Sequence, residues 1–233
     1  MHSSVYCGSL RCLERLGGNY KVDVPGNFRH LSAAFTFMES LAQQLEALRT
    51  TVENFRSQLP AVEITGKKLA ATLAGGGRIL TCGNGGSACD ALHLSEELVG
   101  RFDQNRRSLA AICLSADAPL LTCIANDFGY DAVFARQVEG LGRPGDALIV
   151  FSTSGNSMNL VAALQAARKN GLATISLLGK NGGKCLGLAD HDIIIPSSTT
   201  ARIQELHTFI LHGWLGLIEL ELGLNQPPAA AAR

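Results

Sequence analysis

Four hydroxyl side chains and a glycine occur within six residues, directly after the apolar run 147–151 and before the helix-forming stretch 160–168. The first turn of a helix has backbone N–H groups without partners and partial positive charge, so it attracts anions. One hydroxyl is enough for an ordinary helix cap, which is the alternative interpretation, and four exceed that need. Gly155 lets the backbone approach an anion closely. The pattern predicts a phosphate-binding loop, whose hydroxyls belong to Ser152, Thr153, Ser154 and Ser157.

A second polar loop, Gly-Asn-Gly-Gly-Ser at residues 83–87, also follows an apolar strand-like run and opens a helix. It matches neither the dinucleotide-binding spacing of glycines nor a Walker loop, which needs Gly-Lys-Ser/Thr. Ligands of open α/β sheets bind beyond the carboxyl ends of the strands, so both loops should lie at one edge. Two short polar loops suit one phosphate and a polyol better than a nucleotide. The alternative is a pair of tight turns with no ligand.

His93 and Glu97 lie four residues apart in a predicted helix and therefore face the same way. An imidazole and a carboxylate so placed can bind one metal ion or act together as acid and base. Glu96, three residues from His93, competes with Glu97 for either role. Taken alone, the pair is more often a plain surface contact. A second polar cluster, Arg-Ile-Gln-Glu-Leu-His at 202–207, shares the last helix with His212.

The elements that must position these groups alternate between strand and helix from residue 78 onward. Short apolar strands separated by helices predict an α/β fold with a parallel sheet and helices on both faces. Residues 1–28 are expected to form an irregular extension, 29–224 a single domain, and 225–233 a frayed tail. The predicted strands are 78–82, 109–114, 147–151, 172–178 and 192–195. The predicted helices are 30–57, 62–73, 87–99, 118–125, 131–141, 156–168 and 201–222.

Composition narrows the functional class of these 233 residues. With 46% hydrophobic and only 17% charged residues, the chain is apolar for a soluble monomer, which suggests surface buried between subunits. A formal net charge of zero argues against nucleic-acid or anionic-membrane partners. No apolar run is long enough to predict a transmembrane helix or a secretory signal. Seven cysteines, an odd number with three in or beside apolar runs, favour reduced core thiols in the cytoplasm over disulfides.

Five stretches of the chain, in order and with matching spacing, resemble the phosphoheptose isomerases (sedoheptulose-7-phosphate isomerases) of the sugar isomerase (SIS) domain superfamily. The resemblance covers about residues 30–222. The Ser-Thr-Ser-Gly-Asn-Ser loop marks only the superfamily, whereas the His-x-x-x-Glu pair together with the Arg-Ile-Gln-Glu-x-His helix is much more specific. The stretches are 82–87 (CGNGGS), 93–101 (HLSEELVGR), 125–130 (ANDFGY), 152–157 (STSGNS) and 201–207 (ARIQELH).

The resemblance implies a three-layer αβα sandwich with a five-stranded parallel sheet of flavodoxin-like SIS type, preceded by N-terminal helices. It implies an aldose–ketose isomerase that converts sedoheptulose 7-phosphate to D-glycero-D-manno-heptose 7-phosphate through an enediol or enediolate. That reaction begins the synthesis of the heptose in bacterial surface glycans such as lipopolysaccharide. Members of the family are cytoplasmic homotetramers, and several bind zinc at the active site.

Site roles follow from the same resemblance, position by position. Glu97 becomes the base that moves a proton between C1 and C2, and His212 its acid–base partner on the hydroxyls. The phosphate is held by Ser152, Thr153, Ser154 and Ser157. The sugar is lined by Asn84, Gly85, Gly86, Ser87, Glu97, Asn126, Asp127 and Gln204, and zinc is held by His93, Glu97, Gln204 and His212.

Three questions stay open at this point. A carboxylate bound firmly to zinc is a poor base, so Glu97 does not do both jobs at once. Gln204 and His212 are eight residues apart, ~12 Å along one helix, so their side chains would have to extend far to reach the same metal ion. His207, three residues after Gln204, is the fallback ligand. We therefore expect the pocket to be completed by a neighbouring subunit. Alternative functions are a non-catalytic SIS-domain protein that binds the replication initiator, and an isomerase of another sugar phosphate.

Overall fold

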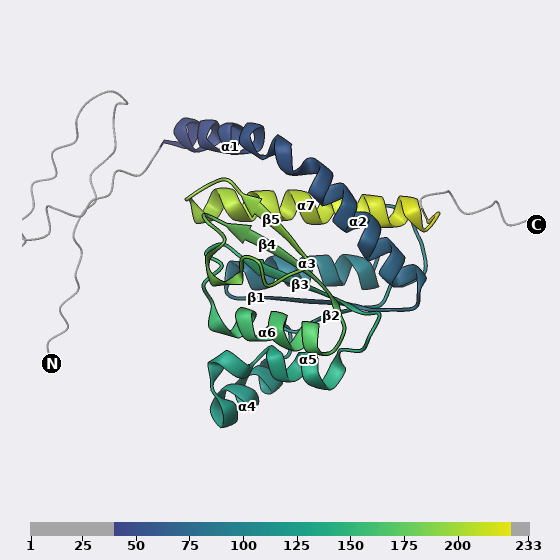
Figure 1. The fold of residues 1–233 in the computed structure, drawn as a ribbon. Helices are drawn as coiled ribbons and strands as arrows, with labels where there is room; N and C mark the ends of the chain where they lie inside the picture. The colour runs from purple at the N-terminus through teal and green to yellow at the C-terminus, as the bar shows by residue number, and fades with distance from the viewer. Residues whose placement is uncertain (1–39, 225–233) are drawn as a thin grey trace, which may run out of the picture. The chain divides into compact units, whose positions relative to one another are not determined.

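The structure is a computed structural model that describes residues 40–224, so the predicted extension 1–28 and tail 225–233 lie outside the described residues. The predicted domain bounds therefore remain a prediction. The elements, shown in Figure 1, are α1 (Leu41–Phe55), η1 (Arg56–Gln58), α2 (Leu59–Ala74), β1 (Ile79–Gly83), α3 (Gly86–Val99), β2 (Ala111–Cys113), α4 (Ala118–Phe128), η2 (Tyr130–Ala132), α5 (Ala135–Leu141), β3 (Ala147–Ser152), α6 (Met158–Lys169), β4 (Ala173–Gly179), η3 (Gly183–Cys185), β5 (His191–Ile195) and α7 (Thr200–Glu221).

Within the described residues, the strands form one parallel sheet in the order β2-β1-β3-β4-β5. This is the flavodoxin-like order, and it confirms the predicted fold class. From β1 the chain first moves to β2 on one side, and the connection from β2 then returns past β1 to β3 on its other side. The carboxyl ends of β1 and β3 therefore flank the topological switch point, where such sheets bind ligands. The two polar loops predicted to bind the substrate follow these two strands.

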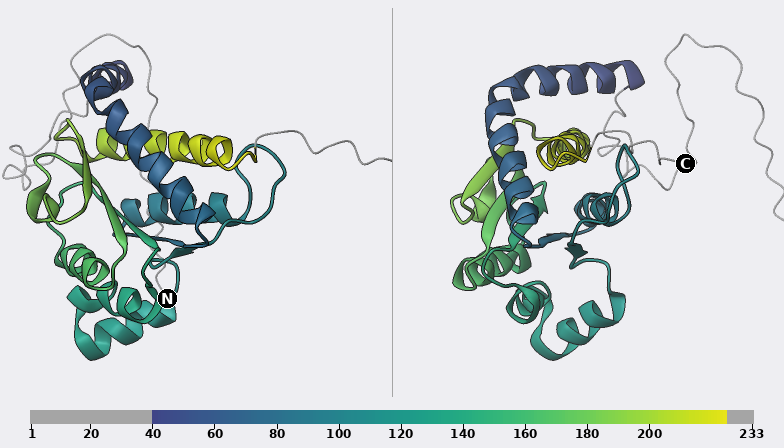
Figure 2. Two further views of the ribbon diagram at one scale, coloured as in Figure 1. Left: turned by 45° about the vertical axis from the view of Figure 1, so that its right-hand side comes forward. Right: turned by 90° about the vertical axis from the view of Figure 1, so that its right-hand side faces the viewer.

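Helices cover both faces of the sheet, as Figures 1 and 2 show, with α2, α3 and α7 on one face and α4, α5 and α6 on the other. Alternation along β3 explains how one strand serves both layers. Ile149 and Phe151 belong to the core under α3 and α7, whereas Leu148 and Val150 belong to the core under α6. All six residues of β3 are buried, as expected for a central parallel strand.

The cysteines within the described residues are free thiols, but of the three predicted to be core residues only Cys82 is buried, whereas Cys113 is partly buried and Cys123 is exposed. Cys82 and Cys185 are buried, and burial raises the thiol pKa of Cys185 to about 11 and that of Cys82 well above its ordinary value. Such thiols are unreactive packing groups. Cys7 and Cys12 lie outside the described residues. No helix in the described part of the chain has the length and apolarity of a membrane span.

Candidate active site

The two polar loops meet at the switch point, because Gly83 at the end of β1 pairs with Phe151 near the end of β3. Between them lies a cavity of about 170 Å³. Its volume matches a phosphate group and part of a sugar better than a nucleotide. The cavity is lined by Asn84, Ser87, Phe151, Ser152, Thr153, Ser154, Ser157 and Leu160.

The loop of residues 152–157, here called the phosphate cradle, contributes its four hydroxyl residues to the lining of this cavity. Ser157 is the N-cap residue of α6, yet its side chain makes no capping hydrogen bond to the residues described here, so the simple-cap interpretation fails. The backbone N–H of Gly155 donates to Ser152 Oγ at 3.0 Å, which leaves the hydroxyl proton of Ser152 for a ligand. Gly155 has a φ of +65°, and a Cβ there would lie 1.9 Å from the carbonyl oxygen of Gly182. Only glycine fits this turn.

Asn84 in the second loop belongs to a network that the sequence analysis missed. Asn84 and Asn159 exchange two amide hydrogen bonds, each 3.0 Å long. Tyr130 donates its hydroxyl to Asn84 Oδ1 at 2.8 Å. Asn159 is a buried polar residue beside the cradle, which is the kind of signal that could have indicated a role. Asn126 and Asp127 hydrogen-bond to each other on α4 and are not among the residues that line the cavity.

Helices α3 and α7 run side by side and in the same direction, as a series of contacts shows. The side chain of Gln204 lies against the backbone of Gly86, where an added Cβ would sit 2.1 Å from Nε2. One turn further, Thr208 Oγ1 donates to Asp90 Oδ1 at 3.3 Å. Two turns further, the rings of His93 and His212 meet edge to face with centroids 5.0 Å apart. Gln204 is thus at the cradle end of this helix pair.

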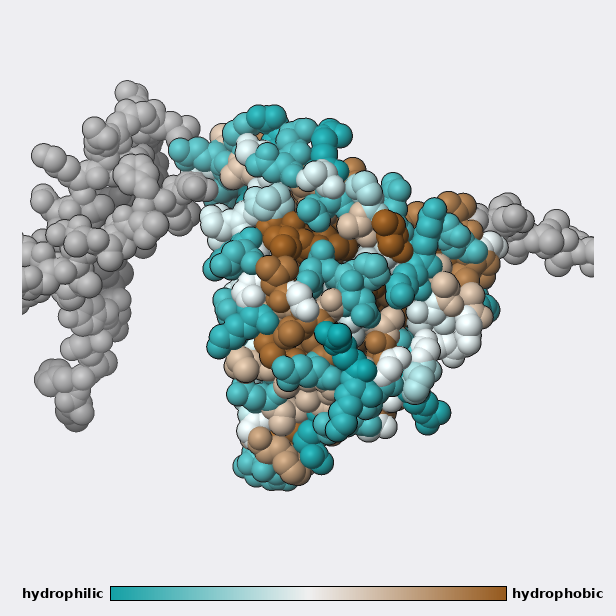
Figure 3. Space-filling model, in the orientation of Figure 1, coloured by the Kyte–Doolittle hydropathy of each residue, from teal (hydrophilic) through white to brown (hydrophobic). Residues whose placement is uncertain are grey.

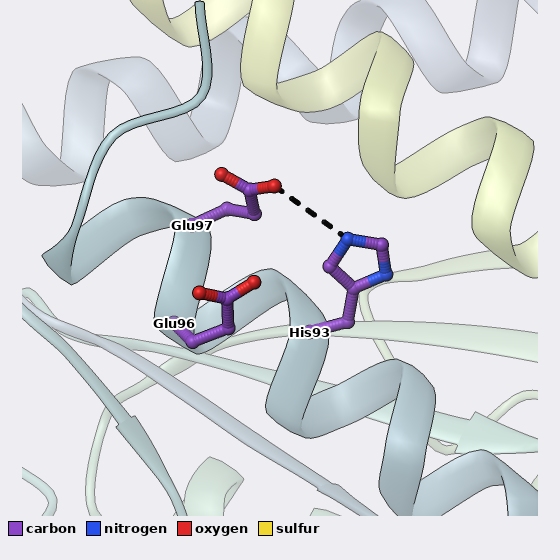
Figure 4. Close-up of side chains that lie close together, drawn as sticks. All are labelled: His93, Glu96 and Glu97. Carbon is purple, nitrogen blue, oxygen red and sulfur yellow. Dashed lines mark ion pairs between the residues drawn. The ribbon is translucent and has the colours of Figure 1, made fainter. Parts of the chain in front are cut away.

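The other end of the pair holds a cluster of His93, Glu97 and His212, called the His–Glu cluster below. Figure 4 shows His93 and Glu97 pointing toward each other, with Nε2 and Oε1 3.7 Å apart. Ligand atoms of His93, Glu96 and Glu97 lie within 4.8 Å of one another. Phe102, from the loop after α3, stacks on the imidazole of His212 with centroids 5.6 Å apart and planes at 25°.

The ligand atoms close enough to hold one ion are those of His93, Glu96 and Glu97, an imidazole and two carboxylates, which are groups that zinc accepts. His212 lies outside that group and contacts the ring of His93. His93 and Glu97 are only half-buried, which leaves the cluster open to a ligand. The Gln204 amide lies beside Gly86, at the cradle end of the helix pair. Its role as a fourth zinc ligand remains a prediction. The fallback ligand His207 is fully buried against Phe151 and Asp90 rather than within the cluster.

A buried ion pair behind the cluster is a second feature that sequence reasoning missed. Arg106 Nε donates to Glu219 Oε1 at 2.6 Å, and both side chains are almost fully buried. The same guanidinium donates to the carbonyl oxygens of Glu97 and Leu98 at 2.8 and 3.0 Å. These carbonyls belong to the last turn of α3, which lacks partners within the helix. Arg106 therefore ties the turn that bears Glu97 to α7.

Comparison with known proteins agrees with this geometry. The model of the SIS domain matches residues 42–179, which places the fold and its phosphate cradle among SIS-domain proteins. The phosphoheptose isomerase of Yersinia pestis (strain Pestoides F) is 45% identical over 190 residues, or 80% of this chain and 98% of that protein. The corresponding protein of Tolumonas auensis is 42% identical over 192 residues, which are 81% of this chain and all of the relative.

Two solved structures of phosphoheptose isomerases also resemble this chain. Phosphoheptose isomerase GmhA from Neisseria gonorrhoeae superposes with a TM-score of 0.73 at 36% identity, covering 77% of this chain and 96% of that one. A phosphoheptose isomerase from Francisella tularensis gives a TM-score of 0.73 at 32% identity, covering 78% of this chain and all of the other. The chain belongs to the phosphoheptose isomerase family.

Proposed function

We propose that this chain is a sugar-phosphate isomerase that interconverts sedoheptulose 7-phosphate and D-glycero-D-manno-heptose 7-phosphate. The observation that supports this best is the hydroxyl-lined cavity at the switch point together with Glu97 and His212, each of which contacts His93 on the helix pair α3 and α7. The printed names of the relatives, phosphoheptose isomerase, support the same substrate. The product would enter heptose synthesis for a bacterial surface glycan such as lipopolysaccharide, in the cytoplasm.

The reaction moves one proton between two adjacent carbons and another between their oxygens. Glu97 removes the proton from one carbon and returns it to the other, with an enediol or enediolate between the two transfers. His212 exchanges protons with the two oxygens, and Phe102 and His93 hold its ring on two sides. Ser152, Thr153, Ser154 and Ser157 bind the phosphate, which fixes the distance from the anion to the reacting carbons.

Zinc is proposed as the resident metal, bound by His93, Glu97 and His212 with Gln204 as the predicted fourth ligand. When bound, zinc would polarise the carbonyl oxygen and stabilise the negative charge that forms there. Because a carboxylate on zinc would be a weakened base, Glu97 would serve either as a ligand or as the base, and not as both at once.

We further propose that the chain forms a homotetramer with active sites shared between subunits. Ser87 at the cradle and Glu97 are ten residues apart, ~15 Å along α3. A seven-carbon chain built from bonds of about 1.5 Å spans only about 8 Å. A cradle from one subunit and a His–Glu cluster from its neighbour would remove this mismatch.

An apolar groove supports self-association. The groove lies between α1, η1 and α7 and has a volume of about 330 Å³. Val52 and Phe209 in its lining are 42% and 54% exposed, and Figure 3 shows brown, apolar surface below α1. Exposed apolar surface of this kind marks a contact site. The groove is lined by Leu48, Val52, Phe55, Arg56, Leu59, Glu205, Leu206 and Phe209.

The function is tested by incubating the purified chain with sedoheptulose 7-phosphate and following the aldose by NMR. Turnover is expected in the zinc-loaded protein, with loss of activity on chelation and recovery on adding zinc. Fructose 6-phosphate and an amino-sugar phosphate serve as competing substrates, and faster turnover of either would replace the proposed one. A protein that lacks all isomerase activity with zinc present, and that captures the replication initiator, would establish the binding-protein alternative instead.

The proposed tetramer is tested by light scattering of the variant Phe209→Asp, whose measured mass should fall below that of a tetramer.

A further inference from the structure

The hydrogen bond between Tyr130 and Asn84 connects two segments that the sugar subsite needs. Asn84 lies in the loop after β1 and lines the cavity next to the cradle. Tyr130 lies in η2, directly after α4, the helix that contains Asn126 and Asp127. The side chain of Tyr130 is exposed, so its hydroxyl is at the surface of the molecule rather than in the core. An exposed tyrosine gains little stability from such a bond, which suggests a role in recognition.

The local backbone is built to bring this hydroxyl back to Asn84. Gly129, between α4 and η2, has a φ of +85° and a ψ of 158°. Side chains other than hydrogen are almost excluded from that region of backbone space. No heavy atom lies within 4 Å of a Cβ built at Gly129, so the glycine meets a conformational need and not a steric one. The turn reverses the chain so that Tyr130 faces the β1–α3 loop.

Counting donors and acceptors shows what the bond does to Asn84. Its Oδ1 accepts from both Tyr130 Oη and Asn159 Nδ2, which occupies both lone pairs of the carbonyl. Its Nδ2 donates one proton to Asn159 Oδ1, which leaves one N–H free. With Tyr130 in place, Asn84 can offer a ligand a donor and no acceptor. Without the tyrosine hydroxyl, Asn84 Oδ1 would have an unoccupied lone pair facing the space where the ligand binds.

We propose that Tyr130 is a positioning residue for substrate recognition, which fixes the Asn84 amide so that its free N–H donates to an oxygen of the sugar-phosphate chain. The inference rests on the proposed function and adds to it a residue that selects the polyhydroxylated part of the substrate. The phosphate is bound separately by the cradle. Loss of the Tyr130 hydroxyl should therefore weaken sugar binding and leave anion binding unchanged.

The variant Tyr130→Phe tests this by removing one oxygen. One neutral hydrogen bond corresponds to roughly a 3- to 10-fold change in an equilibrium constant. We expect KM for sedoheptulose 7-phosphate to rise by about that factor, with kcat changed less than twofold. The inhibition constant of inorganic phosphate and the Tm should not change. Thr122→Val is the matched control, because it removes a hydroxyl from neighbouring α4 that bonds only to that helix's own carbonyls, and its kinetics should equal those of the wild type.

A double-mutant cycle with Asn84→Ala then shows whether Tyr130 acts through Asn84. We expect the double variant to be no weaker for the sugar phosphate than Asn84→Ala alone. Fully additive losses, an unchanged KM in Tyr130→Phe, or an equal loss of inorganic phosphate binding would each overturn the inference. A wild-type chain that binds sedoheptulose 7-phosphate no more tightly than inorganic phosphate would instead refute the proposed function, and this inference with it.

Discussion

The phosphate cradle and the His–Glu cluster are built in opposite ways, although we propose that both serve one reaction. The cradle comes from six consecutive residues, and its shape is set by the end of β3, the start of α6 and one glycine turn. The cluster brings together side chains from α3 and α7 that are more than a hundred residues apart in the chain. Local backbone geometry defines the cradle, whereas the cluster depends on how two helices pack.

This difference determines which changes each region tolerates. The cradle offers a proposed anion several hydroxyls and backbone N–H groups, so the loss of one hydroxyl would leave others. In the cluster, one carboxylate (Glu97) is proposed as the base and one imidazole (His212) as its acid–base partner. No other group is proposed to replace either of them. Damage to the cluster should therefore appear in kcat, and damage to the cradle in the binding of phosphate.

Glu97→Gln is expected to have the largest effect. Removing a general base lowers the rate by about 10²- to 10⁴-fold. We expect a loss of about 10³-fold in kcat, with inorganic phosphate bound as tightly as by the wild type. Glu97 is partly exposed, so the fold should be retained.

Glu96→Gln is the matched control, because this carboxylate is the next residue on the same helix and is exposed. A change of less than threefold in kcat is expected. A larger loss in Glu96→Gln than in Glu97→Gln would reverse the assignment of the base.

Arg106→Met should have the next largest effect, because it leaves Glu219 charged and buried without its partner. Removing one member of a buried ion pair costs about 3–5 kcal/mol of the free energy of unfolding. Urea denaturation measures this loss. The surviving folded protein should show a lower kcat and unchanged phosphate binding, because Arg106 also holds the carbonyl of Glu97.

The double variant Arg106→Met/Glu219→Leu separates these two roles. It removes both charges, so most of the lost stability should return. The low kcat should persist, since the carbonyls of Glu97 and Leu98 still lack the guanidinium. Full recovery of kcat would show that Arg106 affects only stability.

The sequence predicted the cradle better than the cluster, and the two types of construction explain why. Strand, hydroxyl-rich turn and helix are consecutive in the sequence, so the loop and a parallel α/β sheet can be inferred from local pattern, whereas the flavodoxin-like type of sheet came from the family resemblance. The cluster could be inferred on one helix, from the four-residue spacing of His93 and Glu97. The addition of His212 came from the family resemblance, because local pattern says nothing about which helices become neighbours.

Other parts of the site were beyond sequence reasoning for the same physical reason. Arg106 lies in an irregular loop, and its partner Glu219 is 113 residues away. Tyr130 meets Asn84 across 46 residues. Polar residues in loops and at helix ends are usually solvated, so nothing in their local sequence distinguishes these from ordinary surface groups.

Gly155→Ala and Gly85→Ala form a pair that tests how closely the cradle depends on backbone geometry. Both glycines have positive φ, +65° and +57°, so alanine is strained by about 1–3 kcal/mol at either position. A Cβ at Gly155 also meets the carbonyl of Gly182, whereas at Gly85 no heavy atom lies within 4 Å. We expect inorganic phosphate binding, measured by calorimetry, to fall roughly tenfold or more in Gly155→Ala and by less in Gly85→Ala. Equal losses would mean that torsional strain alone matters and that the contact with Gly182 does not.

Phe102→Leu should have the smallest effect and tests the packing of the cluster directly. An aromatic pair contributes about 0.5–1.5 kcal/mol beyond the area that it buries, equivalent to about 2- to 12-fold in rate if all of it orients the catalytic ring. Because leucine keeps the apolar contact but loses the flat face against His212, we expect kcat to fall about threefold with KM unchanged. Phe102→Tyr keeps the ring and should restore the rate. If leucine and tyrosine gave the same kcat, apolar cover alone would hold His212, and the cluster would be less dependent on ring geometry than its construction suggests.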